Sequence, residues 1–246
     1  MTSTITSLAD QVMAALDTVV DPELDEPVTD LGFVRSVDID DVGVAVHLRL
    51  PTSFCSPNFA YLMASDARDA LQRVPDIGHI VVELDDHHDS DKINAGLAAE
   101  AGYRGTFGSE AQTSLDDLRA AFKSKAHTAA MERSLQSLLR TQPSLAVADL
   151  GSVRLGQLPA GRTTDALVQR RAAIGLSTAD DAPVMVTDEG RPVPAEDIPM
   201  KLKFARAARV SIEGNSHFCR GLLATRYSDD EAGDMSTRVT DSRGRS

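Results

Sequence analysis

The chain has 246 residues, enough for one large domain or two small ones. Its net charge of -12, without a long basic run, argues against a nucleic-acid partner, because phosphate backbones would be repelled. The sequence holds no stretch of about 18 apolar residues that would predict a membrane span, and its N-terminus lacks the basic and apolar pattern of a secretory signal. We therefore expect a cytoplasmic protein that binds neither nucleic acid nor membrane.

The first 90 residues contain five segments with a regular apolar period. These are a helix over 7–20, strands over 31–39 and 42–50, a helix over 57–72 and a strand over 79–84. Ser7 can cap the first helix with Asp10, and Pro22 ends it. Asp40-Asp41 suits a tight connection, so the first two strands should form a hairpin. The order helix, strand, strand, helix, strand predicts a compact α+β domain over residues 1–90.

The remaining residues predict a mostly helical C-terminal region over 91–227. Helical patterns occupy 93–101, 114–140, 164–174, 201–208 and 217–225, and a short strand is expected over 184–187. The pattern itself indicates no role for this region. Past Ser228 the chain is polar and charged with almost no apolar residues, so residues 228–246 should form a disordered tail.

Cys55 and Cys219 are the two cysteines, and no C-x-x-C pair occurs, so the chain cannot hold a four-cysteine metal or cluster site by itself. A bound metal would need His or Asp ligands, a second subunit of a homo-oligomer, or a partner protein. Cys55 directly precedes Ser56, the expected N-cap of the second helix, where helix amides favour a thiolate. A thiolate binds soft metals or attacks electrophiles, whereas the alternative is an inert buried cysteine.

Two histidine-containing segments have side chains that can bind iron or zinc. His87 and His88 precede two aspartates, but neighbouring side chains diverge, and aspartates before a helix are commonly caps. His217 and Cys219 would point the same way in a strand and diverge in a helix. The alternative for the second pair is a buried cysteine beside a surface histidine, and a composite site of Cys55, Cys219 and a histidine also stays open.

The acidic residues Asp21, Glu23 and Asp30 could bind a hard cation, although such residues more often cap turns. The sequence contains no Walker A loop, no G-x-S-x-G elbow and no H-E-x-x-H helix. A stand-alone enzyme with Cys55 as nucleophile would need a histidine partner that the sequence does not suggest. We therefore expect a protein that is not an enzyme.

Three short motifs occur in order within the predicted α+β domain. They are Asp21-Pro22-Glu23-Leu24, Asp30-Leu31-Gly32, and Leu50-Pro51-Thr52 followed by Cys55-Ser56. Together they resemble the PaaD-like family of iron–sulfur cluster assembly accessory proteins, over about residues 5–90.

This resemblance implies a function in metalloprotein maturation. Cys55 would be the reactive or metal-touching thiol, with Asp30 and Thr52 shaping its loop. The cargo would be iron or an iron–sulfur cluster, held transiently. The partner would be a client metalloprotein, such as a component of a multicomponent oxygenase or its reductase. The alternative is a non-catalytic adaptor or chaperone-like scaffold that binds an oxygenase component without chemistry at Cys55.

Overall fold

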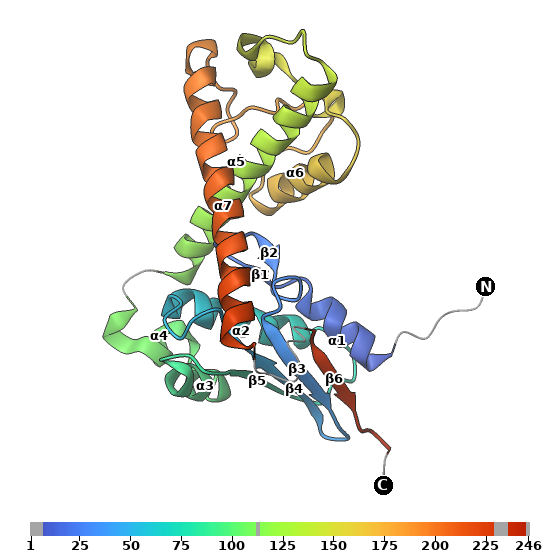
Figure 1. Cartoon of the computed structure of the whole chain (residues 1–246), viewed down its shortest axis with the longest axis vertical. Coiled ribbons are helices and arrows are strands. Elements are labelled where there is room, and N and C mark those ends of the chain that lie inside the picture. The colour runs from blue at the N-terminus through green and yellow to red at the C-terminus, as the bar shows by residue number, and fades with distance from the viewer. Residues whose placement is uncertain (1–6, 112–113, 229–235, 245–246) are drawn as a thin grey trace, which may run out of the picture. The chain divides into compact units, whose positions relative to one another are not determined.

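The computed structural model describes residues 7–111, 114–228 and 236–244. The chain divides into two units (Figure 1): unit 1 holds residues up to Leu115 and from Asn215 onward, and unit 2 holds Asp116–Gly214. The long helix α7 (Ile198–Arg226) begins in unit 2 and ends in unit 1. No helix among the described residues combines the length and the apolar run that crossing a membrane would require.

Unit 1 confirms the predicted α+β class. Its elements in chain order are α1 (Leu8–Leu16), β1 (Val20–Asp21), β2 (Glu26–Pro27), β3 (Val34–Ile39), β4 (Gly43–Leu48), α2 (Pro57–Leu71), β5 (His79–Leu84), α3 (Ser90–Ala98), α4 (Gly102–Phe107), the 3-10 turn η1 (Gly108–Glu110) and β6 (Arg238–Asp241). The N–H of Asp10 donates to Ser7 Oγ (3.1 Å), and the Ser7 N–H donates to Asp10 Oδ2 (3.2 Å). This confirms the capping box predicted for α1.

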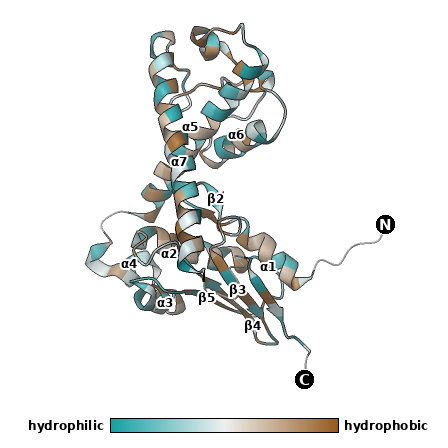
Figure 2. Ribbon diagram, in the orientation of Figure 1, coloured by the Kyte–Doolittle hydropathy of each residue, from teal (hydrophilic) through white to brown (hydrophobic). Residues whose placement is uncertain are grey.

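The main sheet has the order β5-β4-β3-β6. β3 and β4 form the predicted antiparallel hairpin, in which Asp40 Oδ1 accepts hydrogen bonds from the N–H groups of Val42 (2.8 Å) and Gly43 (2.9 Å). β5 pairs with β4 in parallel, after the crossover through α2. One face of the sheet is buried in the core with α1 and α2. Figure 2 shows apolar and polar residues alternating along β3 and β4, as a sheet with one polar face requires.

The structure differs from the predicted boundary near residue 90, because residues 91–115 belong to unit 1. Tyr103 and Phe107 of α4 are buried there, with ring centroids 5.5 and 5.9 Å from that of Tyr61 in α2. Burial of these large rings ties α4 to the α+β core. The polar segment before α3 therefore lies within a domain and does not separate two domains.

The expected disordered tail is wrong for residues 236–244. β6 pairs in parallel with the edge of β3 (Figure 1), and the Ser242 N–H donates to the Ile39 carbonyl (2.9 Å). An edge strand offers free backbone donors and acceptors, so a segment with few apolar residues can still join it. The rest of the expected tail, residues 229–235 and 245–246, lies outside the described residues.

Unit 2 is mostly helical, as expected. It contains α5 (Leu115–Thr141), the 3-10 turns η2 (Val147–Ser152), η3 (Leu155–Gln157) and η4 (Ala195–Asp197), α6 (Arg162–Ala173) and the first part of α7. A separate core includes Met131, Leu135 and Leu167. The strand expected over 184–187 is wrong, since Val186 forms only an isolated bridge with Pro192.

The two helices expected over 201–208 and 217–225 are one continuous helix, α7. Between the two predicted segments, residues 209–216 include charged side chains that form ion pairs, so the apolar pattern of a helix is interrupted there. Arg209 Nε, for example, lies 2.5 Å from Glu132 Oε2.

Candidate functional site

The turn at Asp21 is held by its own carboxylate. Asp21 Oδ1 accepts hydrogen bonds from the N–H groups of Glu23 and Leu24, both at 2.9 Å. Its side chain is only 7% exposed, and this burial raises the pKa of the carboxyl to about 6. The two backbone hydrogen bonds oppose the rise, whereas the charges of Glu23 and Glu26 add to it. Asp21 is thus a buried turn-capping residue.

The loop that follows β4 carries Cys55. Thr52 Oγ1 accepts a hydrogen bond from the Phe54 N–H (3.1 Å) and lies 3.7 Å from Cys55 Sγ. The Phe54–Thr52 hydrogen bond closes a tight turn in the loop, and the Thr52 hydroxyl lies beside the Cys55 thiol. Ser56 and Pro57 begin α2 as expected, although Ser56 makes no side-chain capping hydrogen bond. Cys55 is a free, partly exposed cysteine.

His87 braces the Cys55 backbone from the turn after β5. Its Nδ1 accepts a hydrogen bond from the Asp89 N–H (3.1 Å), so the proton of a neutral ring sits on Nε2. Nε2 then donates to the Cys55 carbonyl at 2.8 Å. His87 is buried, with 6% of its surface exposed. Both ring nitrogens are therefore engaged: Nδ1 bonds within the turn after β5, and Nε2 links that turn to the Cys55 loop.

His88 differs from His87 in its surroundings. Its side chain is exposed, and its ring centroid lies 5.8 Å from that of Phe54. Its backbone N–H donates to the Ser53 carbonyl (2.9 Å), which adds a second link between this turn and the Cys55 loop. Phe54 is 81% exposed, an unusual position for a large apolar ring directly beside a thiol.

Cys219 lies on the part of α7 that belongs to unit 1, partly buried against the same core as Cys55. Burial, followed by the neighbouring Asp21, Cys55 and Glu23, raises the pKa of the Cys219 thiol to about 11. The thiol is therefore protonated at neutral pH and is a weak metal ligand in this state. His217 is exposed and lies on the same helix, where residues two apart diverge.

The structure does not gather the expected metal ligands into one site. No three His, Cys, Asp or Glu side chains within the described ranges are arranged to hold a metal ion. Asp30 is exposed, and its carbonyl accepts a hydrogen bond from Arg220 (3.1 Å) on α7. Metal binding by Cys55, His87, His88 or Cys219 stays a prediction, as does the shaping of the Cys55 loop by Asp30.

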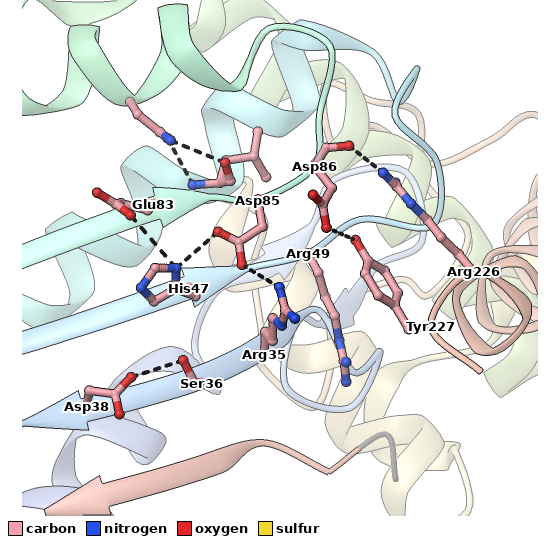
Figure 3. Close-up of polar contacts among 12 residues, drawn as sticks. Arg35, Ser36, Asp38, His47, Arg49, Glu83, Asp85, Asp86, Arg226 and Tyr227 are labelled. Atoms are coloured by element: carbon pink, nitrogen blue, oxygen red, sulfur yellow. Dashed lines mark hydrogen bonds and ion pairs between the residues drawn. The ribbon is translucent and has the colours of Figure 1, made fainter. Parts of the chain in front are cut away.

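The polar face of the sheet leads to the same turn after β5 (Figure 3). His47 Nδ1 lies 3.0 Å from Asp85 Oδ1, and Arg35 Nη1 lies 3.2 Å from Asp85 Oδ2. Glu83 is 3.8 Å from the same His47 nitrogen. These partly exposed pairs contribute little stability individually, but they fix the start of the turn that carries His87.

Sequence reasoning missed the residues of α7 that reach these motifs. Asn215 donates to Glu23 Oε1 (3.0 Å) and Ser216 to Glu26 Oε1 (2.5 Å), while Arg220 pairs with Glu26. Arg226 donates to Ser53 Oγ (2.7 Å) within the Cys55 loop. Each contact joins residues more than 170 positions apart, and no local pattern in the sequence indicates such pairs.

Comparison with known proteins supports the family resemblance that the motifs in unit 1 indicated. A family model described as "Iron-sulfur cluster assembly protein" matches residues 9–84. The uncharacterized protein MJ1129 of Methanocaldococcus jannaschii is 30% identical over 86 residues, which cover 35% of this chain and 88% of that protein. The Fe-S protein maturation auxiliary factor YitW of Bacillus subtilis is 31% identical over 78 residues, 32% of this chain and 76% of that protein. No solved structure is significantly similar to the chain.

Proposed function

The chain belongs to the iron–sulfur cluster assembly protein family, and from this premise we propose that it is a cytoplasmic accessory factor, not an enzyme. Its task is to help install iron or an iron–sulfur cluster in a client metalloprotein. Family membership supports the role in assembly, and the name of the Bacillus subtilis relative describes maturation of Fe-S proteins. The client is a component of a multicomponent oxygenase or its reductase, a choice supported by the motif resemblance.

The observation that carries the proposal is the setting of Cys55. It is the one cysteine inside the residues that the family model matches. Its thiol is partly exposed, Thr52 lies beside it, and His87 holds its carbonyl in place. A soft ligand on a fixed loop is suited to meet a cluster or a metal ion that a partner presents.

A single thiolate favours transfer over storage. Cys55 can occupy only one coordination position of an iron atom after its thiol loses a proton. The other positions must be filled by a donor, by the client or by small thiols. Burial raises the pKa of the Cys219 thiol, which makes it a poorer ligand than an ordinary thiol at neutral pH. The cargo is therefore held weakly and passes on to a client that offers more ligands.

A second candidate is the pure adaptor, which binds the client without chemistry at Cys55. The exposure of Phe54 favours it, since a large apolar ring at a surface is a common anchor of protein interfaces. Phe54→Ala should weaken client binding in both cases, so this variant does not separate the two candidates. Cys55→Ser does.

The experiment uses cells from which the gene has been deleted and measures the activity and iron content of their oxygenase. Wild type and Cys219→Ser should restore both quantities, whereas Cys55→Ser should restore neither, although it still binds the oxygenase component. Full restoration by Cys55→Ser would support the adaptor. If deletion itself leaves the oxygenase fully loaded with iron, the choice of client is wrong.

A further inference from the structure

We infer that Arg226, at the end of α7, is a positioning residue for the Cys55 loop. The inference rests on the proposed function only in taking Cys55 as the working thiol. Arg226 lies far outside residues 9–84, the range that the family model matches. The 86 residues aligned with the Methanocaldococcus jannaschii relative cover 88% of that protein, so its remaining length is too short for a counterpart of unit 2. Arg226 therefore lies outside the part of this chain that the family model describes.

The guanidinium of Arg226 connects two segments next to Cys55, the loop after β4 and the turn after β5, through three acceptors. Nη1 donates to the Leu50 carbonyl (3.0 Å), two residues after β4, and Nη2 donates to Ser53 Oγ (2.7 Å) further along the same loop. Nη2 also donates to the carbonyl of Asp86 in the turn after β5, as Figure 3 shows. Arginine presents five N–H donors in a rigid planar fork, so one side chain can serve acceptors in three directions. A lysine ammonium at the end of a flexible stem lacks this geometry.

Packing around Tyr227 fixes where the guanidinium sits. Tyr227 is buried, and its hydroxyl donates to Asp86 Oδ2 (3.3 Å). Its ring lies 5.2 Å from the guanidinium carbon of Arg49 and 5.3 Å from that of Arg226. Leu223, one turn earlier, is 1% exposed in the core of unit 1. Arg226 therefore reaches the loop from an anchored helix end.

The Cys55 loop is consequently held from two sides. Arg226 fixes Ser53, two residues before the thiol, while His87 fixes the Cys55 carbonyl itself. The Asp86 turn is common to both supports, since Asp86 accepts from Arg226 and His87 follows it directly. Loss of Arg226 should loosen the first half of the loop, which keeps only the hydrogen bond from the His88 N–H to the Ser53 carbonyl among these links, and should leave the second half attached. The expected consequence is a thiol that is more accessible and less well placed.

The test compares the rates at which iodoacetamide alkylates the two cysteines, followed by mass spectrometry of their peptides in the intact folded protein. Arg226→Ala should raise the Cys55 rate several-fold and leave the Cys219 rate unchanged. Arg226→Lys should behave like Arg226→Ala, because a charge alone does not span the three acceptors. The matched control is Arg220→Ala, which removes α7 contacts to Glu26 and Asp30 but none to the loop, and it should leave the Cys55 rate unchanged.

Two results would overturn the inference. One is an unchanged Cys55 rate in Arg226→Ala. The other is a parallel rise at Cys55 and Cys219, which would mean that the helix end undocks as a whole. If Arg226→Ala does not fold, Ser53→Ala removes the acceptor from the loop side and should raise the Cys55 rate in the same selective way. Alkylation requires neither a cluster nor a client. An unchanged alkylation rate would therefore count against the inference about Arg226 and not against the proposed function.

Discussion

Replacing Asp21 by Asn should make unit 1 more stable at neutral pH and remove part of its pH dependence. Asn keeps an oxygen that can accept the hydrogen bonds from the N–H groups of Glu23 and Leu24, but it carries no charge. The wild-type carboxylate must ionise while 7% exposed and close to the charges of Glu23 and Glu26. The substitution therefore measures the free-energy cost of the buried charge while the hydrogen bonds of the turn are kept.

The magnitude follows from the pKa of Asp21, which rises from 3.8 to about 6 on folding. One pKa unit corresponds to about 1.4 kcal/mol, so the ionised side chain costs the folded state about 3 kcal/mol. Between these two values the folded protein binds a proton that the unfolded chain has released. The free energy of unfolding of unit 1 therefore falls as the pH rises from about 4 to about 6, and it levels off above that.

Tyrosine fluorescence during urea unfolding measures this effect in unit 1 alone. The chain has no Trp, and its three tyrosines, Tyr61, Tyr103 and Tyr227, all belong to unit 1. The difference in unfolding free energy between Asp21→Asn and wild type should grow by about 3 kcal/mol in favour of Asn as the pH rises through the window. Taking the difference cancels the pH effects of other groups that the two proteins share.

Asp21→Ala supplies the control. It removes the charge and also the acceptor, so it should be less stable than Asp21→Asn by about 1–3 kcal/mol at every pH. A difference between Asp21→Asn and wild type that stays flat with pH would refute the reasoning. It would show that the carboxylate ionises in the folded state as easily as in the unfolded chain.

Three further predictions concern single side chains. The raised pKa of Cys219, about 11, predicts that its alkylation rate increases about tenfold per pH unit without a plateau below about pH 10, and a plateau near pH 8 in peptide mass spectrometry would contradict it. Burial, with Arg171 and Lys201 nearby, lowers the pKa of His127 to about 4, so unit 2 should lose about 3 kcal/mol of stability as the pH falls from about 6.5 to about 4. Hydrogen exchange in α5 should show this loss in wild type but not in His127→Leu. His87→Leu leaves the Cys55 carbonyl without its donor and should destabilise unit 1 by about 1–3 kcal/mol in urea, whereas an unchanged midpoint would remove the bracing role.

Local patterns predicted the elements that carry the site. The capping box of α1, the hairpin at Asp40 and the start of α2 at Pro57 depend on residues a few positions apart, and the structure has them where the sequence places them. The motif order also identified the family and the loop that holds Cys55. Patterns among residues close in sequence were therefore sufficient to predict that Cys55 lies in the loop before α2.

Contacts between distant segments could not be predicted in this way. β6 joins β3 across about two hundred residues by backbone pairing, for which its polar sequence gives no signal. No local pattern indicates that Arg226 and Arg220, near the end of α7, contact Ser53 and Asp30. His87 was a candidate ligand by residue type, and only the fold shows that both its nitrogens are engaged in hydrogen bonds.

The central claim is that Cys55 is the thiol through which this protein handles its cargo. The most direct measurement is the iron and sulfide content, with the visible spectrum, after anaerobic reconstitution in the presence of glutathione, which can supply the remaining thiolates. Wild type and Cys219→Ser should both bind iron and sulfide with cluster absorbance, and Cys55→Ser should show none. Equal iron and sulfide in Cys55→Ser, or no iron in the wild type, would contradict the claim and leave a protein that acts by holding its client.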